Sequence, residues 1–161
     1  MVIENEVKIR LDEAEFVKVI DLLGKSQFHT QTNSFFKVKK GFLRLREENN
    51  KLFLTFKGKK IESEFKACEE TELELSKESK STILRLLENL GLKFLFQYTK
   101  QRASYYFSDC VVCLDILENG KKYIEIEGNN ESIKEKINSL NLNLKNIEEK
   151  SYFKMHRGKN D

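Results

Sequence analysis

The chain of 161 residues is long enough for one domain with a hydrophobic core, and its 39% hydrophobic and 34% charged residues are typical of a soluble globular protein. Its 29 basic and 26 acidic side chains leave a net charge of only +3, which excludes a protein that binds nucleic acid through bulk electrostatics. No apolar run approaches the roughly 18 residues of a membrane span, and the start MVIENEV lacks the layout of a signal peptide. We therefore expect one cytoplasmic domain over residues 1–161.

The first segment, VIENEVKIRL (residues 2–11), alternates charged and apolar side chains, which is the pattern of a β-strand with one polar and one apolar face. Its polar face begins with two carboxylates, Glu4 and Glu6, and continues with Lys8 and Arg10. Neighbouring carboxylates repel each other. The pattern would mean little on a solvated strand, but it is informative if the face borders an enclosed space.

Three segments have helical periodicity: residues 12–24, 76–91 and 130–140. The first opens with Asp12 and Glu15 at the spacing of a capping box and stops at Gly24. The second has Ser76 as its expected N-cap and Gly91 as its stop.

Seven further segments read as strands: residues 35–40, 42–47, 51–58, 69–75, 97–107, 111–117 and 121–128. Sequential strands joined by short turns pair in antiparallel fashion. About eight such strands with three helices predict an α+β fold whose core is an antiparallel β-barrel.

The charged faces of these strands are sorted by sign. The acidic positions are Glu4, Glu6, Glu70, Glu72, Glu74, Asp115, Glu125 and Glu127, and the basic positions are Lys8, Arg44, Arg46, Lys57, Lys100 and Arg102. Solvated faces usually mix both signs, because like charges side by side are unfavourable. An ordinary face in water remains one interpretation, and an enclosed ligand site is the other.

Carboxylates alone make an all-oxygen environment that suits Mg²⁺ or Mn²⁺ rather than zinc or copper. Arginine and lysine suit a highly anionic ligand, so a metal-bound polyphosphate would satisfy both sets. The chain has neither a Gly-x-x-x-x-Gly-Lys-Ser/Thr nor a Gly-x-Gly-x-x-Gly motif, so we do not expect phosphate binding by loop amides and a helix N-terminus.

Zinc is not expected, because His29 and His156 have no ligand spacing. Cys110 and Cys113 fall in a predicted strand, where positions i and i+3 point to opposite faces, so we expect them and Cys68 to be reduced thiols.

Several motifs, in order, resemble the CYTH superfamily, also called triphosphate tunnel metalloenzymes. Glu4-x-Glu6-x-Lys8 is similar to the family's Glu-x-Glu-x-Lys signature, and QTNSFF to its Gln-x-Asn/Asp-x-Tyr-Phe strand. The segments LRLREENNKLFLTFKG, ETELEL, KQRASYYF, VCLDILENGKKYIEIEG and KSYFKM resemble its later motifs. The family includes class IV adenylyl cyclases, thiamine triphosphatases and inorganic tripolyphosphatases.

The resemblance implies an eight-stranded barrel open as a tunnel, with the charged faces pointing inward. It implies Mg²⁺ or Mn²⁺ held by Glu4, Glu6, Glu127 and Glu125, with Glu72, Glu74 and Asp115 holding a second ion or ordering its waters. It also implies phosphate binding by Lys8, Arg44, Arg46, Lys57, Lys100, Arg102 and Lys150. Of these, Lys8, Arg46 and Lys57 are the expected catalytic residues.

Two positions depart from the family pattern. Lys37 stands where many members carry Asp, and Phe35 stands where many carry Tyr. Both departures bear on which substrate is bound and not on whether the barrel forms a tunnel.

Overall likeness favours a class IV adenylate cyclase-like enzyme that converts ATP to cyclic AMP and pyrophosphate. The alternative is a triphosphatase that hydrolyses inorganic tripolyphosphate or thiamine triphosphate. A third hypothesis is a polyphosphate- or RNA-binding module, since FFKVKKGFLRLR interleaves aromatic and cationic residues, although the acidic faces oppose it. We expect a nucleoside, thiamine or inorganic triphosphate as the substrate, and neither a membrane nor a nucleic acid as a partner. The oligomeric state stays open, a homodimer included.

Overall fold

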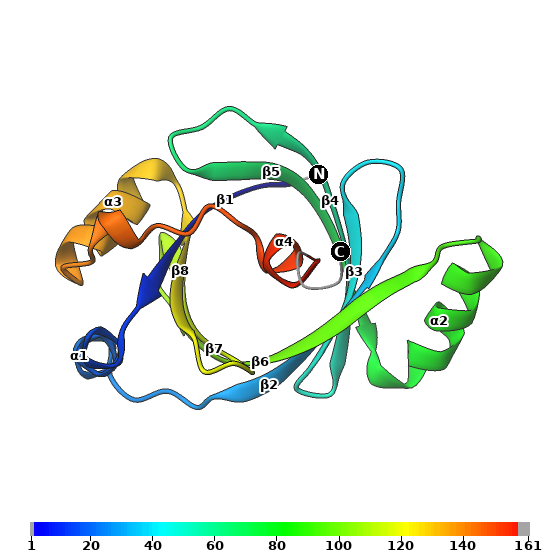
Figure 1. The fold of residues 1–161 in the computed structure, drawn as a ribbon, viewed down its shortest axis with the longest axis horizontal. Coiled ribbons are helices and arrows are strands. Elements are labelled where there is room, and N and C mark those ends of the chain that lie inside the picture. Colours follow the sequence, from blue (N-terminus) through cyan, green and yellow to red (C-terminus); the bar gives the residue numbers. More distant parts are fainter. Residues whose placement is uncertain (1, 158–161) are drawn as a thin grey trace.

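The computed structural model describes residues 2–157 and contains a closed barrel of eight antiparallel strands (Figure 1). The strands are β1 (Val2–Leu11), β2 (His29–Phe36), β3 (Phe42–Glu48), β4 (Lys51–Ile61), β5 (Lys66–Ser76), β6 (Phe94–Tyr106), β7 (Cys110–Leu117) and β8 (Lys122–Gly128). Around the barrel they follow the order β1-β5-β4-β3-β2-β6-β7-β8. The α+β barrel predicted from the sequence is confirmed.

The barrel has its charged side chains inside and its apolar side chains outside. Arg44, Thr55 and Glu72 stand in register across β3, β4 and β5 and lie close to one another around the interior cavity. Leu45 and Leu52, which are 3% and 0% exposed, belong to the opposite face. The main hydrophobic core therefore lies between the barrel wall and the outer helices, while the tunnel interior is largely charged and holds an aromatic cluster around Phe35, Tyr98 and Tyr152 at one end.

Helices cover this outer face on two sides (Figure 1). The helices α1 (Glu13–Leu23) and α3 (Asn130–Ser139) bury the outer side of β1, β7 and β8, where Ile9, Ile124 and Ile126 are fully buried. The helix α2 (Lys80–Asn89) packs Leu87 against β2, β3 and β4. Each fully buried aliphatic side chain stabilises the fold by roughly 1.5–3 kcal/mol.

The capping box predicted for the first helix is present. The Asp12 carboxylate accepts from the Glu15 amide at 2.8 Å, and the Glu15 carboxylate accepts from the Asp12 amide at 2.9 Å. The start predicted for the second helix was wrong. Ser76 precedes a 3₁₀ turn, η1 (Lys77–Ser79), and makes no capping hydrogen bond with its side chain; the α-helix begins only at Lys80.

The strand expected at residues 35–40 was also placed wrongly. Strand β2 ends at Phe36, and the chain then turns through Gly41, whose φ is +73°. A Cβ at Gly41 would lie 2.1 Å from the carbonyl oxygen of Lys57, so the close approach of this turn to β4 requires glycine.

After α3 the chain returns along β1 and ends in a short helix at the barrel. A 3₁₀ turn, η2 (Leu144–Asn146), is followed by a bridge between Ile147 and Ile9. The last helix, α4 (Tyr152–Arg157), lies within the ring of strands in the view of Figure 1. Its six residues are too few for helical periodicity to be read from the sequence.

All helices within residues 2–157 are too short or too polar to cross a membrane.

Candidate active site

A cavity of about 400 Å³ occupies the barrel interior. Its wall combines side chains of both signs from six strands: Glu4, Glu6, Arg44, Arg46, Lys57, Lys60, Lys66, Glu70, Glu72, Lys100, Arg102, Glu125 and Glu127. Aromatic side chains, including Phe35, Phe42, Tyr98, Tyr152 and Phe153, complete the wall.

Carboxylates gather on the β1 side of this cavity. Lys57 forms ion pairs with Glu4 and, at 3.1 Å, with Glu70, and Lys66 forms an ion pair with Glu6. Although burial opposes its charge, Glu4 and Glu6 raise the pKa of Lys57 above its ordinary value. These lysines act as internal counter-ions for the acidic group.

Glu127 adds a further negative charge to the same region. Although Glu127 is exposed at the cavity, partial desolvation there, together with Glu4 and Glu6, raises its pKa to about 7. Burial and the neighbours Glu6 and Glu70 also raise the pKa of Glu4. The carboxylates thus exceed the lysines that compensate them, which is the electrostatic condition that a divalent cation would relieve.

Within residues 2–157 no three acidic, histidine or cysteine side chains converge in the arrangement of a formed metal centre. The donor chemistry fits a hard cation, while lysines hold two of the donors.

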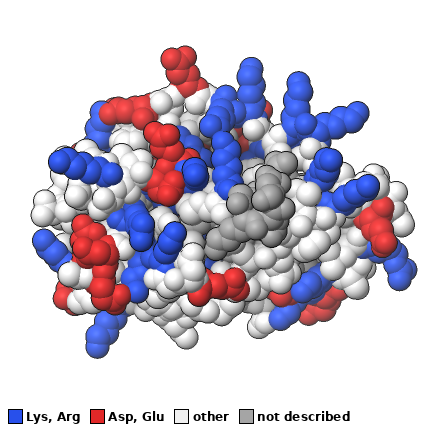
Figure 2. All heavy atoms as spheres, in the orientation of Figure 1, with Lys and Arg blue, Asp and Glu red and all other residues white. Residues whose placement is uncertain are grey.

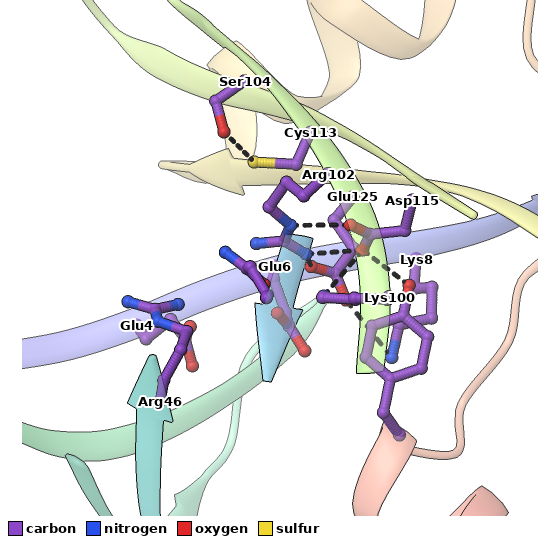
Figure 3. A network of polar contacts seen from close by, with 12 residues as sticks. Glu4, Glu6, Lys8, Arg46, Lys100, Arg102, Ser104, Cys113, Asp115 and Glu125 are labelled. Atoms are coloured by element: carbon purple, nitrogen blue, oxygen red, sulfur yellow. Dashed lines mark hydrogen bonds and ion pairs between the residues drawn. The ribbon is translucent and has the colours of Figure 1, made fainter. Parts of the chain in front are cut away.

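The neighbouring wall, formed by β6, β7 and β8, carries a network around Asp115, shown in Figure 3. Asp115 accepts hydrogen bonds from Lys100 at 2.9 Å, from Arg102 at 2.6 and 2.5 Å, and from the Tyr152 hydroxyl at 2.8 Å. Arg102 also forms an ion pair with Glu125, to which the Lys8 ammonium group lies 3.3 Å away. Burial and the neighbouring Arg102 lower the pKa of Lys100 to about 8.

Strand β3 supplies two arginines to a third part of the wall. Arg46 lies 3.4 Å from both Glu48 and Glu72, and its guanidinium group lies 4.8 Å from the centre of the Phe53 ring. Arg44 donates to the Thr55 hydroxyl at 3.3 Å. Planar guanidinium groups bind phosphate oxygens through paired hydrogen bonds.

Asn33 lies opposite Arg46 in the β2–β3 ladder and opposite Tyr98 in the β2–β6 ladder. It is fully buried, and neither atom of its side-chain amide has a hydrogen-bond partner among the described residues. A buried amide without partners is unfavourable by itself, so it calls for an explanation in function.

Most of the residues expected from the sequence lie together at the cavity: Glu4, Glu6, Arg44, Arg46, Lys57, Glu72, Lys100, Arg102, Glu125 and Glu127. Lys8 is buried beside this wall, where its ammonium group contacts Glu125 and the carbonyl oxygen of Lys150. The interior face predicted by alternation is therefore observed along most of its length.

Three expected residues have other surroundings. Glu74 is 54% exposed and pairs with Lys51 at 2.8 Å, beyond the cavity. The side chain of Lys150 is exposed, and the residue meets the site through its backbone carbonyl. Asp115 is completely buried behind Lys100 and Arg102. Glu72 does line the cavity, but its carboxylate lies with Arg44 and Arg46.

Sequence reasoning assigned no role at the site to Lys66, Glu70, Asn33 or Tyr98. Alternation did place Glu70 on the acidic face of its strand, but no ligand role was given to it. Lys66 precedes the segment expected as a strand, and its position depends on how the β4–β5 hairpin closes.

The three cysteines are free thiols, as expected. Cys110 packs in the outer core while Cys113 lines the cavity, so the two point to opposite faces.

Exposed lysines flank the cavity at the β2–β3 turn and at the end of β4: Lys37, Lys39, Lys40, Lys59 and Lys60. Basic side chains project along the upper edge of the face shown in Figure 2. A concentration of positive charge beside a cleft attracts anionic ligands.

The model of the CYTH domain family matches residues 2–155. A Methanocaldococcus jannaschii protein named "Putative adenylate cyclase MJ0240" is 28% identical, and the match covers 95% of this chain and 98% of that protein. A structure of a Pyrococcus horikoshii protein is 26% identical with a TM-score of 0.79, covering 97% of this chain and 99% of that one. A structure of a Hippeastrum candidate adenylyl cyclase, described as having a dominant triphosphatase activity, is 18% identical with a TM-score of 0.73 and shares the fold; the match covers 99% of this chain and 96% of that one.

Proposed function

The chain belongs to the CYTH domain family, and from this premise we propose that it cleaves a linear triphosphate in the barrel cavity with the help of a divalent cation. One observation carries the proposal: an acidic group and a basic group line a single cavity of about 400 Å³. A metal-bound triphosphate presents a cation to the first group and phosphate oxygens to the second. A cation alone would explain only the acidic group and an anion alone only the basic group, so a ligand that carries both charges explains the pair.

The residues that would hold the cation are Glu4, Glu6 and Glu127. Their carboxylates are in excess over nearby lysines, as the raised pKa of Glu127 reflects. When bound, Mg²⁺ or Mn²⁺ would neutralise phosphate charge and polarise the phosphoryl group. Glu125 is held by Arg102 and Lys8, so its contribution is to fix those two cations.

The phosphate chain would lie against Arg44, Arg46, Lys57, Lys100 and Arg102. Phosphoryl transfer depends on positioning and on stabilising the charge of the equatorial and leaving oxygens, which fixed cations in a secluded site can do. Lys57 lies among the carboxylates, so it would contact a phosphate at the boundary between the two groups.

Hydrolysis is the reaction that this geometry supports best. The end of the cavity where an organic group could extend is filled by α4. Phe153 stacks on Phe42 with centroids 5.3 Å apart, and His156 stacks on Tyr98 at 4.2 Å. An inorganic triphosphate needs no room there.

Cyclisation of ATP is the second candidate. The motif likeness favours it, and the relative in M. jannaschii carries the name of a candidate adenylate cyclase. For this reaction α4 would have to make room for a nucleoside. A polyphosphate- or RNA-binding role is less favoured, because the carboxylates on the β1 side would repel a phosphate backbone.

One incubation separates these candidates. Purified protein with Mg²⁺ or Mn²⁺ is given tripolyphosphate, thiamine triphosphate or ATP in separate samples, and ³¹P NMR follows the products. Orthophosphate from tripolyphosphate supports hydrolysis, whereas cyclic AMP with pyrophosphate from ATP supports cyclisation. Intact substrates in all samples would contradict both.

A further inference from the structure

Asp115 in β7 is a completely buried carboxylate at the centre of the basic wall. Ionised carboxylates are strongly unfavourable in a protein interior unless they are paired and hydrogen-bonded. The hydrogen-bond partners of Asp115 therefore indicate its role.

Asp115 accepts four hydrogen bonds from three side chains. Its Oδ1 accepts from Arg102 Nε, and its Oδ2 accepts from Lys100 Nζ, Arg102 Nη2 and the Tyr152 hydroxyl. Two cations already neutralise this carboxylate, so a metal ion would have to compete with Lys100 and Arg102 and would be repelled by both. The carboxylates in excess, Glu4 and Glu127, lie in the other part of the cavity.

Lys100 and Arg102 line the cavity, whereas Asp115 does not. The two cations stand on the same face of β6, two residues apart, and would repel each other without a negative charge between them. Asp115 lies opposite Arg102 in the β6–β7 ladder and holds both side chains from behind. Their charged ends are thereby fixed at the edge of the space where a phosphate would lie.

Tyr152 joins α4 to the same network. Its hydroxyl donates to Asp115, and its ring lies under two ammonium groups, with Lys8 Nζ 3.7 Å and Lys100 Nζ 4.3 Å from its centre. Both contacts hold the ammonium groups against the face of the ring.

We infer that Asp115 is a positioning residue, which orients Lys100 and Arg102 towards the cavity and ties them to α4 through Tyr152, and that it does not bind the divalent cation. The inference rests on the proposed function, since it concerns the cations that would hold the triphosphate. It separates Asp115 from the carboxylates that would hold the metal.

The test compares D115N with E4Q, a change in the acidic group, using tripolyphosphate as the substrate and Mn²⁺ as the metal. In D115N we expect kcat to fall at least about tenfold, because two cations lose their fixed orientation. We expect KM to rise by no more than about threefold, since removing a negative charge does not weaken the attraction for an anion. The Mn²⁺ concentration for half-maximal activity should stay within about twofold of wild type in D115N and rise about tenfold or more in E4Q.

An increase in the half-activating Mn²⁺ concentration of D115N that matches E4Q would overturn the inference, because it would make Asp115 a metal ligand. An unchanged kcat would overturn it equally. Should D115N fail to fold by circular dichroism, Y152F decides, because it removes one hydrogen bond and keeps the charges. For Y152F we expect a smaller fall in kcat than for D115N, with an unchanged Mn²⁺ dependence. A kcat of Y152F equal to wild type would refute the link to α4.

Failure of the proposed function itself would show differently. If wild-type protein cleaves no triphosphate, the melting temperature is measured with and without Mn²⁺. D115N, or Y152F in its place, should then keep the increase that Mn²⁺ gives wild type while E4Q loses most of it; loss in the Asp115 or Tyr152 variant would overturn the inference.

Discussion

Glu6 and Glu127 stand directly opposite each other in the β1–β8 ladder, so two carboxylates share one position of the tunnel wall. Like charges directly opposite across an antiparallel pair are destabilising. Lys66 compensates Glu6, but Glu127 has no ion pair among residues 2–157. The facing carboxylates therefore destabilise the metal-free protein.

A divalent cation should reverse this destabilisation. We expect Mn²⁺ at millimolar concentration to raise the melting temperature of the wild-type protein, because an ion that binds only the folded state stabilises it by mass action. E127Q should melt higher than wild type without metal and gain less from Mn²⁺. Differential scanning fluorimetry measures both, with E88Q on the exposed surface of α2 as the matched control. An equal Mn²⁺ effect in E127Q and wild type would contradict the assignment of Glu127.

The raised pKa of Glu127 also predicts how stability depends on pH. With a pKa of about 7 in the folded protein and an ordinary value of 4.5, Glu127 binds more protons in the folded than in the unfolded state between those pH values. Stability falls with rising pH wherever the folded state binds more protons. The contribution of Glu127 is thus present below pH 4.5 and lost as pH rises through about 7.

Urea unfolding of metal-free protein at several pH values between 5 and 8 tests this. The wild type should lose stability relative to E127Q as pH rises. Parallel pH curves for the two proteins would show that Glu127 titrates normally.

Arg46 is expected to recognise the length of the phosphate chain. Its guanidinium group lies near Glu72 and Glu48 and faces the cavity with Arg44. R46A should weaken tripolyphosphate binding at least about tenfold and orthophosphate binding much less, because only the longer anion reaches all the cations. Isothermal titration calorimetry gives both affinities, and R85A on exposed α2 is the control. Equal losses for the two ligands would argue against this role.

Much of this arrangement could be predicted from local pattern. Alternation places Glu4 with Glu6 and Arg44 with Arg46 on one face of a strand. Sorting by sign favoured an enclosed face but left an ordinary solvated face open. The same alternation placed Glu74 on the correct face but could not show that this part of β5 extends beyond the cavity to pair with Lys51. Position along a barrel axis depends on strand stagger, which no single strand encodes.

The roles within the interior depended on contacts between distant parts of the chain. Asp115 is separated by 37 residues from Tyr152, and its metal assignment rested on residue type alone. Lys66 reaches Glu6 only because the β4–β5 hairpin returns to β1. Helix α4 is held at the barrel end by aromatic packing of Phe153 rather than by helical propensity.

Asn33 should show a trade-off between stability and activity. Its amide is buried without partners among the described residues, and such groups destabilise a protein by about 1–3 kcal/mol. N33L keeps a similar volume and removes the polar atoms, so its melting temperature should rise while kcat/KM for the triphosphate falls. S34A, which removes the neighbouring hydroxyl that donates to the Gln97 side chain, serves as the control. If N33L were less stable than wild type with full activity, Asn33 would have a structural role instead.

The position of Phe153 should decide which triphosphates are accepted. Its ring contacts Phe35, Phe42 and Phe96 at centroid distances of 5.1, 5.3 and 5.4 Å, and it fills the aromatic end of the cavity. F153A should open this end, and the space would suit the flat ring of a nucleobase or of thiamine better than it suits phosphate.

We therefore expect F153A to raise kcat/KM for ATP or thiamine triphosphate relative to tripolyphosphate by at least about fivefold, even if the absolute rates fall with the loss of packing. Competition experiments that contain both substrates measure the ratio directly, and F107A, at a partly exposed ring beside Lys136 outside the cavity, controls for loss of an aromatic side chain. An unchanged ratio would mean that α4 closes the barrel without selecting the substrate, and the proposed preference for inorganic triphosphate would then have to come from the cations alone.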